Sequence, residues 1–187
     1  MALLLRSFAG SHLYGLARPE SDLDYYEVHD RSLAGNLGKE RKTVQTIVDG
    51  VDVTAVGLSH FMDLAISGSH QALDAMFSER TAVDEITAMR KGFRVGQHIA
   101  PIYNGIIIKF ALQDTPRKRK HAVRLAYNLH DMMETGRFNP TLTPERAQHV
   151  LATAELEADD FITEIEKVTP YLTIFAYNRS YRQLHGK

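Results

Sequence analysis

The segment from Lys42 to Leu58 constrains the fold most strongly, because it reads as two β-rich runs joined by Asp49-Gly50. An Asp-Gly pair between alternating apolar runs is typical of a β-hairpin, since the tight turn needs positive φ angles. On the second run the small apolar side chains fall on one face, and Asp52 and Thr54 fall on the other. Asp52 is either a polar residue beside a hairpin turn or part of a functional site.

A pair of acidic residues, Asp22 and Asp24, lies earlier in the chain, at the start of a β-rich run. We expect a strand over 22–28, which would place both carboxylates on one face with their Cα atoms roughly 6–7 Å apart. Carboxylates this close repel each other unless a cation lies between them, and Mg²⁺ prefers such hard oxygen ligands. An ordinary turn after Pro19 would account for Asp22 but not for Asp24. If the strand carrying Asp52 is the neighbour, the three carboxylates converge on one edge of a sheet.

Gly10 and Ser11 form a third element, between the first apolar run and the acidic pair. A Gly-Ser turn followed by residues that can start a short helix offers backbone N–H groups and a hydroxyl to phosphate oxygens. Gly-Ser turns are common, so this signal is weak alone. Together with three carboxylates in this order, it predicts a compact site for a metal ion and a phosphorylated ligand.

The order of Gly-Ser, an Asp-x-Asp strand and a third Asp on a later strand resembles the DNA polymerase β-type nucleotidyltransferase superfamily. Residues 10–28, GSHLYGLARPESDLDYYEV, look most like the small predicted nucleotidyltransferases associated with RNA ligases. The likeness continues in VDVTAVGLSHFMDLAISGSHQALDAMFSE and in KHAVRLAYNLHDMMETGRF, so it covers about residues 5–138. A helix often found ahead of the first strand in related proteins has no counterpart here, because the first strand is expected to start almost at Met1.

The resemblance implies an EC 2.7.7-type enzyme that transfers a nucleoside monophosphate from an NTP, such as ATP, to an acceptor hydroxyl and releases pyrophosphate. It implies that Asp22, Asp24 and Asp52 are both catalytic residues and ligands of two Mg²⁺ ions, with Mn²⁺ as the alternative metal. In such a site, Asp52 would also take the proton of the acceptor hydroxyl. The residues assigned to nucleotide binding are Gly10, Ser11, Ser21, Lys120, His121 and Arg124.

The sequence does not distinguish between several acceptors or oligomeric states. An RNA end, a protein hydroxyl and a small molecule are each compatible with the chemistry. A rival hypothesis is an antitoxin-like module with the same fold, acting mainly by binding a partner protein. A third is a helical adaptor in which the α/β half is incidental. Three converging carboxylates favour catalysis, because a scaffold does not need them.

A basic run, Arg117 to His121, stands at the start of a predicted helix. Positive charge at a helix N-terminus opposes the helix dipole, so this choice is mildly unfavourable without an anionic ligand. Lys120 and Arg124 are four residues apart and share a helix face with Asn128 and Asp131. This face would suit a triphosphate or an RNA backbone. The alternative is a solvated helix end.

Composition sets wider limits. The chain has 187 residues, a formal net charge of −1 and no cysteine. The charge predicts no global attraction to nucleic acid, so any such contact needs a local basic patch. Without cysteine there are no disulfides and no thiolate metal sites, which fits a reducing compartment. No run reaches the ~18 apolar residues of a membrane span, so we expect a cytoplasmic protein with no membrane partner.

The pattern along the chain predicts an α+β fold: a small mixed sheet with flanking helices over residues 1–92, followed by a helical half over 93–187. The expected strands are 2–9, 22–28, 42–48 and 51–58, and a loop is expected over 29–39. Helices are expected over 60–66, with Ser59 as the N-cap, and over 70–78. Further helices are expected over 96–113, over 116–135 between Thr115 and Gly136, and over about two dozen residues from Pro144. A final helical tail is expected after Pro170.

Overall fold

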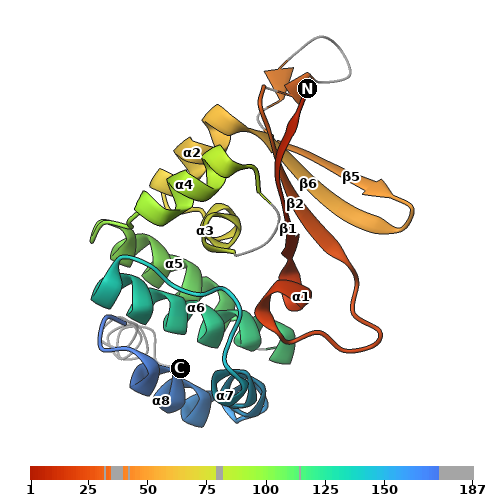
Figure 1. Cartoon of the computed structure of the whole chain (residues 1–187). Helices are drawn as coiled ribbons and strands as arrows, with labels where there is room; N and C mark the ends of the chain where they lie inside the picture. The colour runs from red at the N-terminus through yellow and green to blue at the C-terminus, as the bar shows by residue number, and fades with distance from the viewer. Residues whose placement is uncertain (32, 35–39, 42, 79–81, 114, 173–187) are drawn as a thin grey trace. The chain divides into compact units, whose positions relative to one another are not determined.

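The computed structural model describes residues 1–31, 33–34, 40–41, 43–78, 82–113 and 115–172 (Figure 1). It is a mixed α+β fold with a four-stranded mixed sheet, flanking helices and further helices in the C-terminal half, as the sequence predicts. The chain divides into two compact units. The first contains residues 1–95 and 139–143, and the second contains residues 96–138 and 144–187.

The sheet of the first unit has the strand order β1-β2-β6-β5. Its central strands β2 and β6 are parallel, and the outer pairs β1–β2 and β5–β6 are antiparallel. The strand bounds are Leu3–Ala9 for β1, Asp24–His29 for β2, Thr43–Val48 for β5 and Val51–Gly57 for β6. Two short strands, β3 (Leu33–Ala34) and β4 (Glu40–Arg41), pair separately, within or next to the segment expected as a loop.

The predicted hairpin is confirmed. Strands β5 and β6 pair antiparallel from Thr43–Val56 to Val48–Val51. The turn residues Asp49 and Gly50 have φ angles of 51° and 79°. Positive φ at both central residues matches the right-handed twist of the flanking strands, which is why Asp-Gly is favoured there.

One face of the sheet is covered by helices of the first unit, as Figure 1 shows. These are α2 (Leu58–Ile66), α3 (His70–Phe77) and α4 (Asp84–Gly92). Strand residues Leu5, Val28 and Val56 are fully buried on this side, and so are Phe61 and Leu73 of the helices. The predicted N-cap at Ser59 is wrong, because α2 starts at Leu58 and Gly57 precedes it in an extended conformation.

The second unit contains α5 (Ile99–Ala111), α6 (Pro116–Thr135), α7 (Pro144–Ala154) and α8 (Ala158–Val168). The bounds of α6 are as predicted, because Thr115 accepts the Lys118 N–H and Gly136 adopts the left-handed conformation. The helix expected over 96–113 starts at Ile99, which puts Pro101 in its first turn, where a proline is tolerated.

The single long helix predicted from Pro144 is wrong. The structure has two helices there, α7 and α8, separated at 155–157, where Glu157 is extended. Each of the two helices buries apolar residues, such as Val150 in α7 and Phe161 in α8. The spacing of apolar residues typical of a helix therefore continues across the break. The tail predicted after Pro170 falls almost wholly outside the described residues. No helix of the described chain has the length and hydropathy needed to cross a membrane.

Candidate active site

Asp24 and Asp52 meet at one end of the two central strands. They are register partners in the parallel pair β2–β6, in which Tyr26 pairs with Thr54 and Val28 with Val56. Because side chains alternate along a strand, both carboxylates lie on the face of the sheet that also carries Tyr26 and Val28. Adjacent strands are about 4.8 Å apart, so two negative charges face each other across this pair.

The two carboxylate oxygens of Asp52 differ in their hydrogen bonding. Gln45 of β5 donates from Nε2 to Asp52 Oδ2 over 2.7 Å. Asp52 Oδ1 is buried and has no hydrogen-bond partner among the described residues. A buried oxygen without a donor costs free energy, so this atom is a natural ligand position for a cation.

Gly10 lies against the carboxylate of Asp24. It is the first residue of α1 (Gly10–Tyr14), which directly follows β1, and its φ angle is 59°. A Cβ atom at this position would meet Asp24 Oδ2 at 2.5 Å, which is closer than a carbon and an oxygen can approach. Glycine is therefore required here on two grounds, the positive φ and the contact with Asp24. The Gly-Ser turn and the acidic strand, separate in sequence, are neighbours in the fold.

Asp22 takes a different place from the one predicted. Strand β2 starts at Asp24, so the expected strand from residue 22 is wrong at its beginning. Ser21 closes a turn instead: its N–H donates to the Arg18 carbonyl, and its hydroxyl accepts the Arg18 N–H over 2.8 Å. Asp22 follows this turn and is exposed. The alternation argument that put Asp22 and Asp24 on one face therefore does not apply.

These positions decide how a metal would be held. Among the described residues, no group of three or more histidine, aspartate or glutamate side chains is placed to hold a metal ion. The structure brings together two of the three predicted carboxylates, Asp24 and Asp52. This pair still fits a divalent cation, because it offers hard oxygen ligands and one of them, Asp52 Oδ1, is a buried acceptor without a donor.

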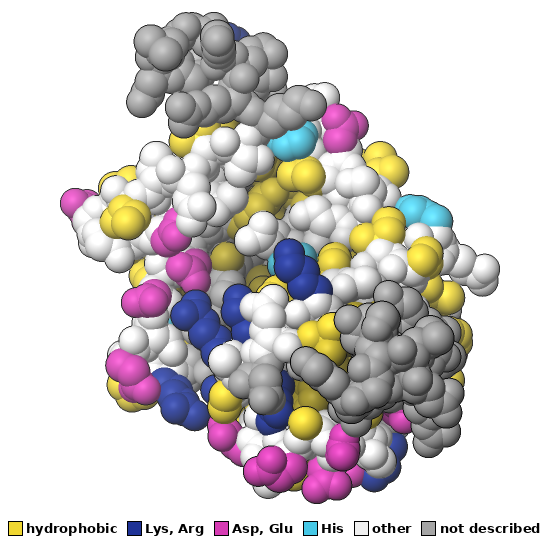
Figure 2. Space-filling view, turned by 180° about the vertical axis from the view of Figure 1, so that it is seen from behind, with side chains coloured by type: hydrophobic (Ala, Val, Ile, Leu, Met, Phe, Trp, Pro, Cys, Tyr) yellow, Lys and Arg dark blue, Asp and Glu magenta, His cyan; other side chains and the backbone are white. Residues whose placement is uncertain are grey.

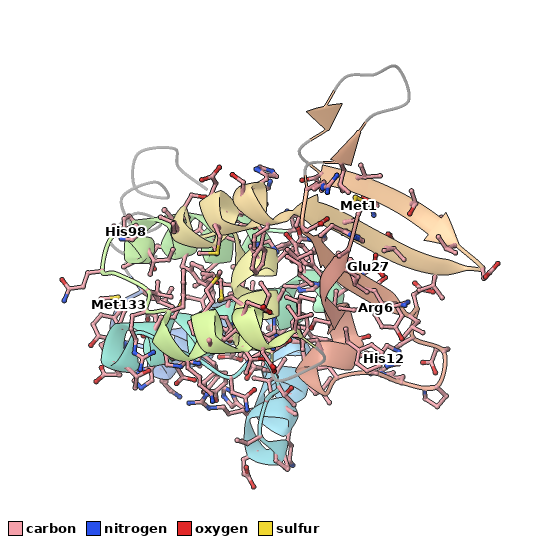
Figure 3. All side chains as sticks on the ribbon, turned by 45° about the horizontal axis from the view of Figure 1, so that its top comes forward. Met1, Arg6, His12, Glu27, His98 and Met133 are labelled. Atoms are coloured by element: carbon pink, nitrogen blue, oxygen red, sulfur yellow. The ribbon has the colours of Figure 1, made fainter. Side chains whose placement is uncertain are left out.

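Aromatic side chains of β1, α1 and β2 form a row. The Phe8 ring stacks on Tyr25 with 5.2 Å between centroids and lies 6.0 Å from the His12 ring. Arg6 lies over Tyr25 at 4.0 Å and forms an ion pair with Glu27 at 3.5 Å. Figure 3 labels Arg6, His12 and Glu27 on these elements. Phe8 and Tyr25 are paired one step along the strands from Ala9 and Asp24, so their side chains lie on the face of the sheet opposite to Asp24 and Asp52.

Three tyrosines close to the site in sequence, Tyr14, Tyr25 and Tyr26, differ in accessibility. Tyr14 and Tyr26 are buried, and Tyr26 packs at 6.1 Å from the Phe61 ring. Burial raises the pKa of Tyr26 to about 12. Tyr25 is only half-buried. Tyr25 is therefore the one of the three whose ring lies partly at the surface.

The basic segment predicted to bind phosphate lies on α6 in the second unit. Lys120 and His121 are half-buried, and His121 stacks on Phe110 with 5.2 Å between centroids. Arg124 is only 1% exposed. With its amide oriented to satisfy both groups, Asn128 donates to the Arg124 carbonyl and accepts from Arg124 Nη1. Arg124 is thus a core residue of this unit rather than part of an exposed basic face.

The fourth member of the predicted helix face, Asp131, is engaged elsewhere. Arg146 of α7 donates to both carboxylate oxygens of Asp131, over 2.7 and 2.9 Å.

Figure 2 shows acidic and basic side chains intermixed on the face that it draws, which agrees with the net charge of −1. Exposed positive charge on α6 is therefore confined to its first residues, chiefly Arg117 and the half-buried Lys118 and Lys120.

Comparison with known proteins adds one relative. No protein-family model matches the chain. The chain is similar to a protein of Enterobacteria phage T4 described as "Uncharacterized 38.9 kDa protein in nrdC-mobD intergenic region", with 34% identity over 87 residues. The match covers 41% of this chain and 26% of the phage protein. This chain thus spans about a quarter of that relative's length, and the relative's description names no activity.

Proposed function

We propose that this protein is a nucleotidyltransferase that moves a nucleoside monophosphate from an NTP to an acceptor hydroxyl at the Asp24–Asp52 end of the sheet. One observation carries the proposal: two carboxylates face each other in register on parallel strands, beside a Gly-Ser turn. Such a pair is unfavourable without a cation and suited to holding one. The order of these elements along the chain supports the same activity through the family resemblance.

The proposal assigns a role to the carboxylates, to Gln45 and to the Gly10-Ser11 turn. Asp24 and Asp52 would hold Mg²⁺, or Mn²⁺ in its place. Asp22 is exposed and lies two residues before Asp24, and it would join them when nucleotide is bound. When bound, two such ions would lower the pKa of the acceptor hydroxyl and neutralise the charge of the triphosphate and the departing pyrophosphate. Gln45 orients the Asp52 carboxylate through its hydrogen bond to Oδ2. Backbone N–H groups and the hydroxyl of the Gly10-Ser11 turn bind phosphate oxygens.

The proposed reaction is an in-line substitution at the α-phosphorus. The acceptor oxygen forms the new P–O bond, and the bond to the bridging oxygen of the β-phosphate breaks. The electron pair of that bond leaves with pyrophosphate, and the proton of the acceptor hydroxyl passes to Asp52. Positioning and neutralisation of charge supply most of the rate in this kind of transfer.

The acceptor proposed first is an RNA end, with a protein hydroxyl or a small molecule as the alternatives. The RNA proposal is supported by the resemblance to RNA-ligase-associated proteins and by the basic start of α6. We also propose a cytoplasmic location, because an NTP substrate and a chain without cysteine both fit a reducing compartment.

The test uses NTPs labelled at either the α- or the γ-phosphate, incubated in Mg²⁺ with total RNA and, separately, with cell protein. We expect the α-label to appear on one acceptor class and the γ-label to leave as pyrophosphate. Transfer of the γ-label would identify a kinase instead. If neither label is transferred and no NTP binds, the protein acts through a partner, as the antitoxin-like alternative holds.

A matched pair of variants ties the transfer to the site. Asp24→Asn should abolish it, because this change removes a proposed metal ligand while keeping the shape of the side chain. Asp63→Asn is the control, since Asp63 is an exposed carboxylate on α2. Equal activity of the two variants would contradict the assignment of the site.

A further inference from the structure

The helix α1 carries the proposed phosphate-binding residues Gly10 and Ser11, and it contains only five residues. An isolated helix of this length is not stable in water, because nucleation costs more free energy than one turn returns. Its own terminal contacts are the Gly15 and Leu16 N–H groups, which both donate to the Ser11 carbonyl. The position of α1 must therefore depend on contacts from other parts of the chain.

One such contact comes from α3. The Tyr14 hydroxyl donates to Asp74 Oδ2 over 2.8 Å, and both residues are buried. A buried carboxylate is costly unless hydrogen bonds compensate it, so Asp74 holds the tyrosine in one position. Tyr14 is the last residue of α1, and this bond fixes the end of the helix to the helical layer of the first unit.

Further contacts come from residues 139–143, which belong to the same compact unit although they lie far along the chain. Thr141 donates from Oγ1 to the Leu13 carbonyl over 2.9 Å, and the Leu142 N–H donates to the Tyr14 carbonyl over 3.1 Å. The last two carbonyl groups of α1 are thus capped by this segment. Its own conformation is supported by Asn139, whose Oδ1 accepts the Thr141 N–H over 3.0 Å.

The packing around Gly15 supports the same picture. A Cβ atom at residue 15 would lie 3.9 Å from both the Leu142 carbonyl oxygen and Thr141 Cγ2. The segment therefore lies directly against the end of α1. The start of α1 lies against the Asp24 carboxylate through Gly10. A shift of one end of this short helix would move the other end relative to the acidic pair.

We propose that Thr141 is a positioning residue for nucleotide binding, which acts through α1 to hold the Gly10-Ser11 turn beside Asp24. This inference rests on the proposed function and adds a residue that no local motif marks. In this role Thr141 acts through its bond to the Leu13 carbonyl and not by contact with the nucleotide or the reacting atoms. Its hydroxyl fixes the turn before the triphosphate binds, so that binding does not have to order it.

The test compares Thr141→Val, which keeps the shape and removes the hydroxyl, with Thr141→Ser, which keeps the hydroxyl. We expect Thr141→Val to raise the KM for NTP about fivefold to tenfold with kcat within about twofold, and Thr141→Ser to restore most of the loss. The control is Thr163→Val, which removes a similar hydroxyl-to-carbonyl bond, from Thr163 to Asp159 in α8. It should leave KM unchanged.

Hydrogen exchange gives a readout that does not depend on activity. In Thr141→Val without nucleotide, the Leu16 amide should exchange faster, because its bond to the Ser11 carbonyl depends on the position of α1. Unchanged exchange and unchanged KM in Thr141→Val, with normal NTP binding by the wild type, would overturn the positioning role alone. A wild type that binds no NTP in Mg²⁺ would overturn the proposed function and this role with it.

Discussion

Asp24 and Asp52 occupy equivalent positions on the parallel strands β2 and β6, so their carboxylates face each other across one strand spacing. Like charges directly opposite in a sheet are destabilising by a few tenths of a kcal/mol to about 1 kcal/mol. This repulsion is one contribution to the stability of the metal-free protein. A bound divalent cation would reverse the sign of the interaction, which makes the pair a test of the site.

Replacing one of these carboxylates should separate folding from metal binding. Without metal, Asp24→Asn should leave the free energy of unfolding unchanged or raise it by up to about 1 kcal/mol, since a repulsion is removed. In Mg²⁺ with NTP, the wild type should gain thermal stability and the variant should not. Transfer should fall at least 100-fold. A variant that keeps more than a tenth of wild-type activity at saturating Mg²⁺ would refute the assignment.

Asp52→Asn should divide nucleotide binding from chemistry. Asp24 remains as a ligand, so NTP binding in Mg²⁺ should persist, with a change in Kd smaller than the change in rate. Transfer should fall by about 100-fold or more, because the proposed base is lost. Single-turnover rates at saturating NTP measure this directly. Loss of NTP binding with no separate effect on the rate would reassign Asp52 to binding alone.

Gly10 offers a third test, with Gly50 as its matched control. Both glycines have positive φ, 59° and 79°, but a Cβ at Gly50 would meet nothing within 4 Å, whereas one at Gly10 would meet Asp24 Oδ2. Gly50→Ala should therefore cost only the backbone strain, about 1–2 kcal/mol, and keep full activity. Gly10→Ala should cost more stability and also lose transfer, because the Asp24 carboxylate must move. Denaturant unfolding and transfer assays at 25 °C give both values. Equal effects of the two variants would show that the contact with Asp24 is unimportant.

Those parts of the fold that depend on local chemistry could be predicted from sequence. The Asp49-Gly50 turn needs only its own φ angles, and α6 needs only Thr115 at one end and Gly136 at the other. The break between α7 and α8 could not be predicted, because residues 155–157 contain neither glycine nor proline. Both helices pack against α6, so tertiary contacts decide where each of them ends.

The candidate site likewise has residues that the sequence predicts and contacts that only the fold reveals. Asp24 and Asp52 could be found because each stands out as an acidic residue within its own β-rich run. Their pairing in register depends on a parallel contact between distant strands, which a local pattern does not encode. Gln45 contacts Asp52 within the predicted hairpin, but nothing in its own residue type marks it as a partner. Thr141 bonds to the Leu13 carbonyl of α1 from 128 residues away, a contact that no local pattern encodes. The start of β2 differs from the prediction because the turn that Ser21 closes with Arg18 precedes Asp22, and the strand begins only at Asp24.

Tyr26 should make the first unit sensitive to alkaline pH. Burial raises its pKa to about 12 from 10.0, so the folded state holds the phenol proton more tightly than the unfolded state does. Its contribution to stability is complete below pH 10 and is lost as pH rises from 10 to 12. Since one pKa unit corresponds to about 1.4 kcal/mol, this loss amounts to roughly 2–3 kcal/mol. Tyr26→Phe should flatten the decline of unfolding free energy over this range. An unchanged decline in the variant would assign it to other groups.

The start of α6 should contribute charge to ligand binding through Lys120 and not through Arg124. Lys120 is half-buried near the helix start, and Lys120→Ala should weaken binding of a single-stranded RNA most at low ionic strength. Loss of one phosphate contact should reduce the slope of log K against log salt by about 0.7. Lys167→Ala, at the end of α8, is the control for charge alone.

Arg124→Ala should behave differently because this side chain is buried in the second unit. It should lower the free energy of unfolding by a few kcal/mol whether or not a ligand is present, because it removes a large buried side chain and its contact with Asn128. A loss of binding in this variant would not by itself identify a phosphate contact. The deciding comparison is therefore between Lys120→Ala and Lys167→Ala, measured as RNA and NTP affinity at two salt concentrations. If their affinities match at both, the basic run is a solvated helix end, and the phosphate-binding role of α6 is withdrawn.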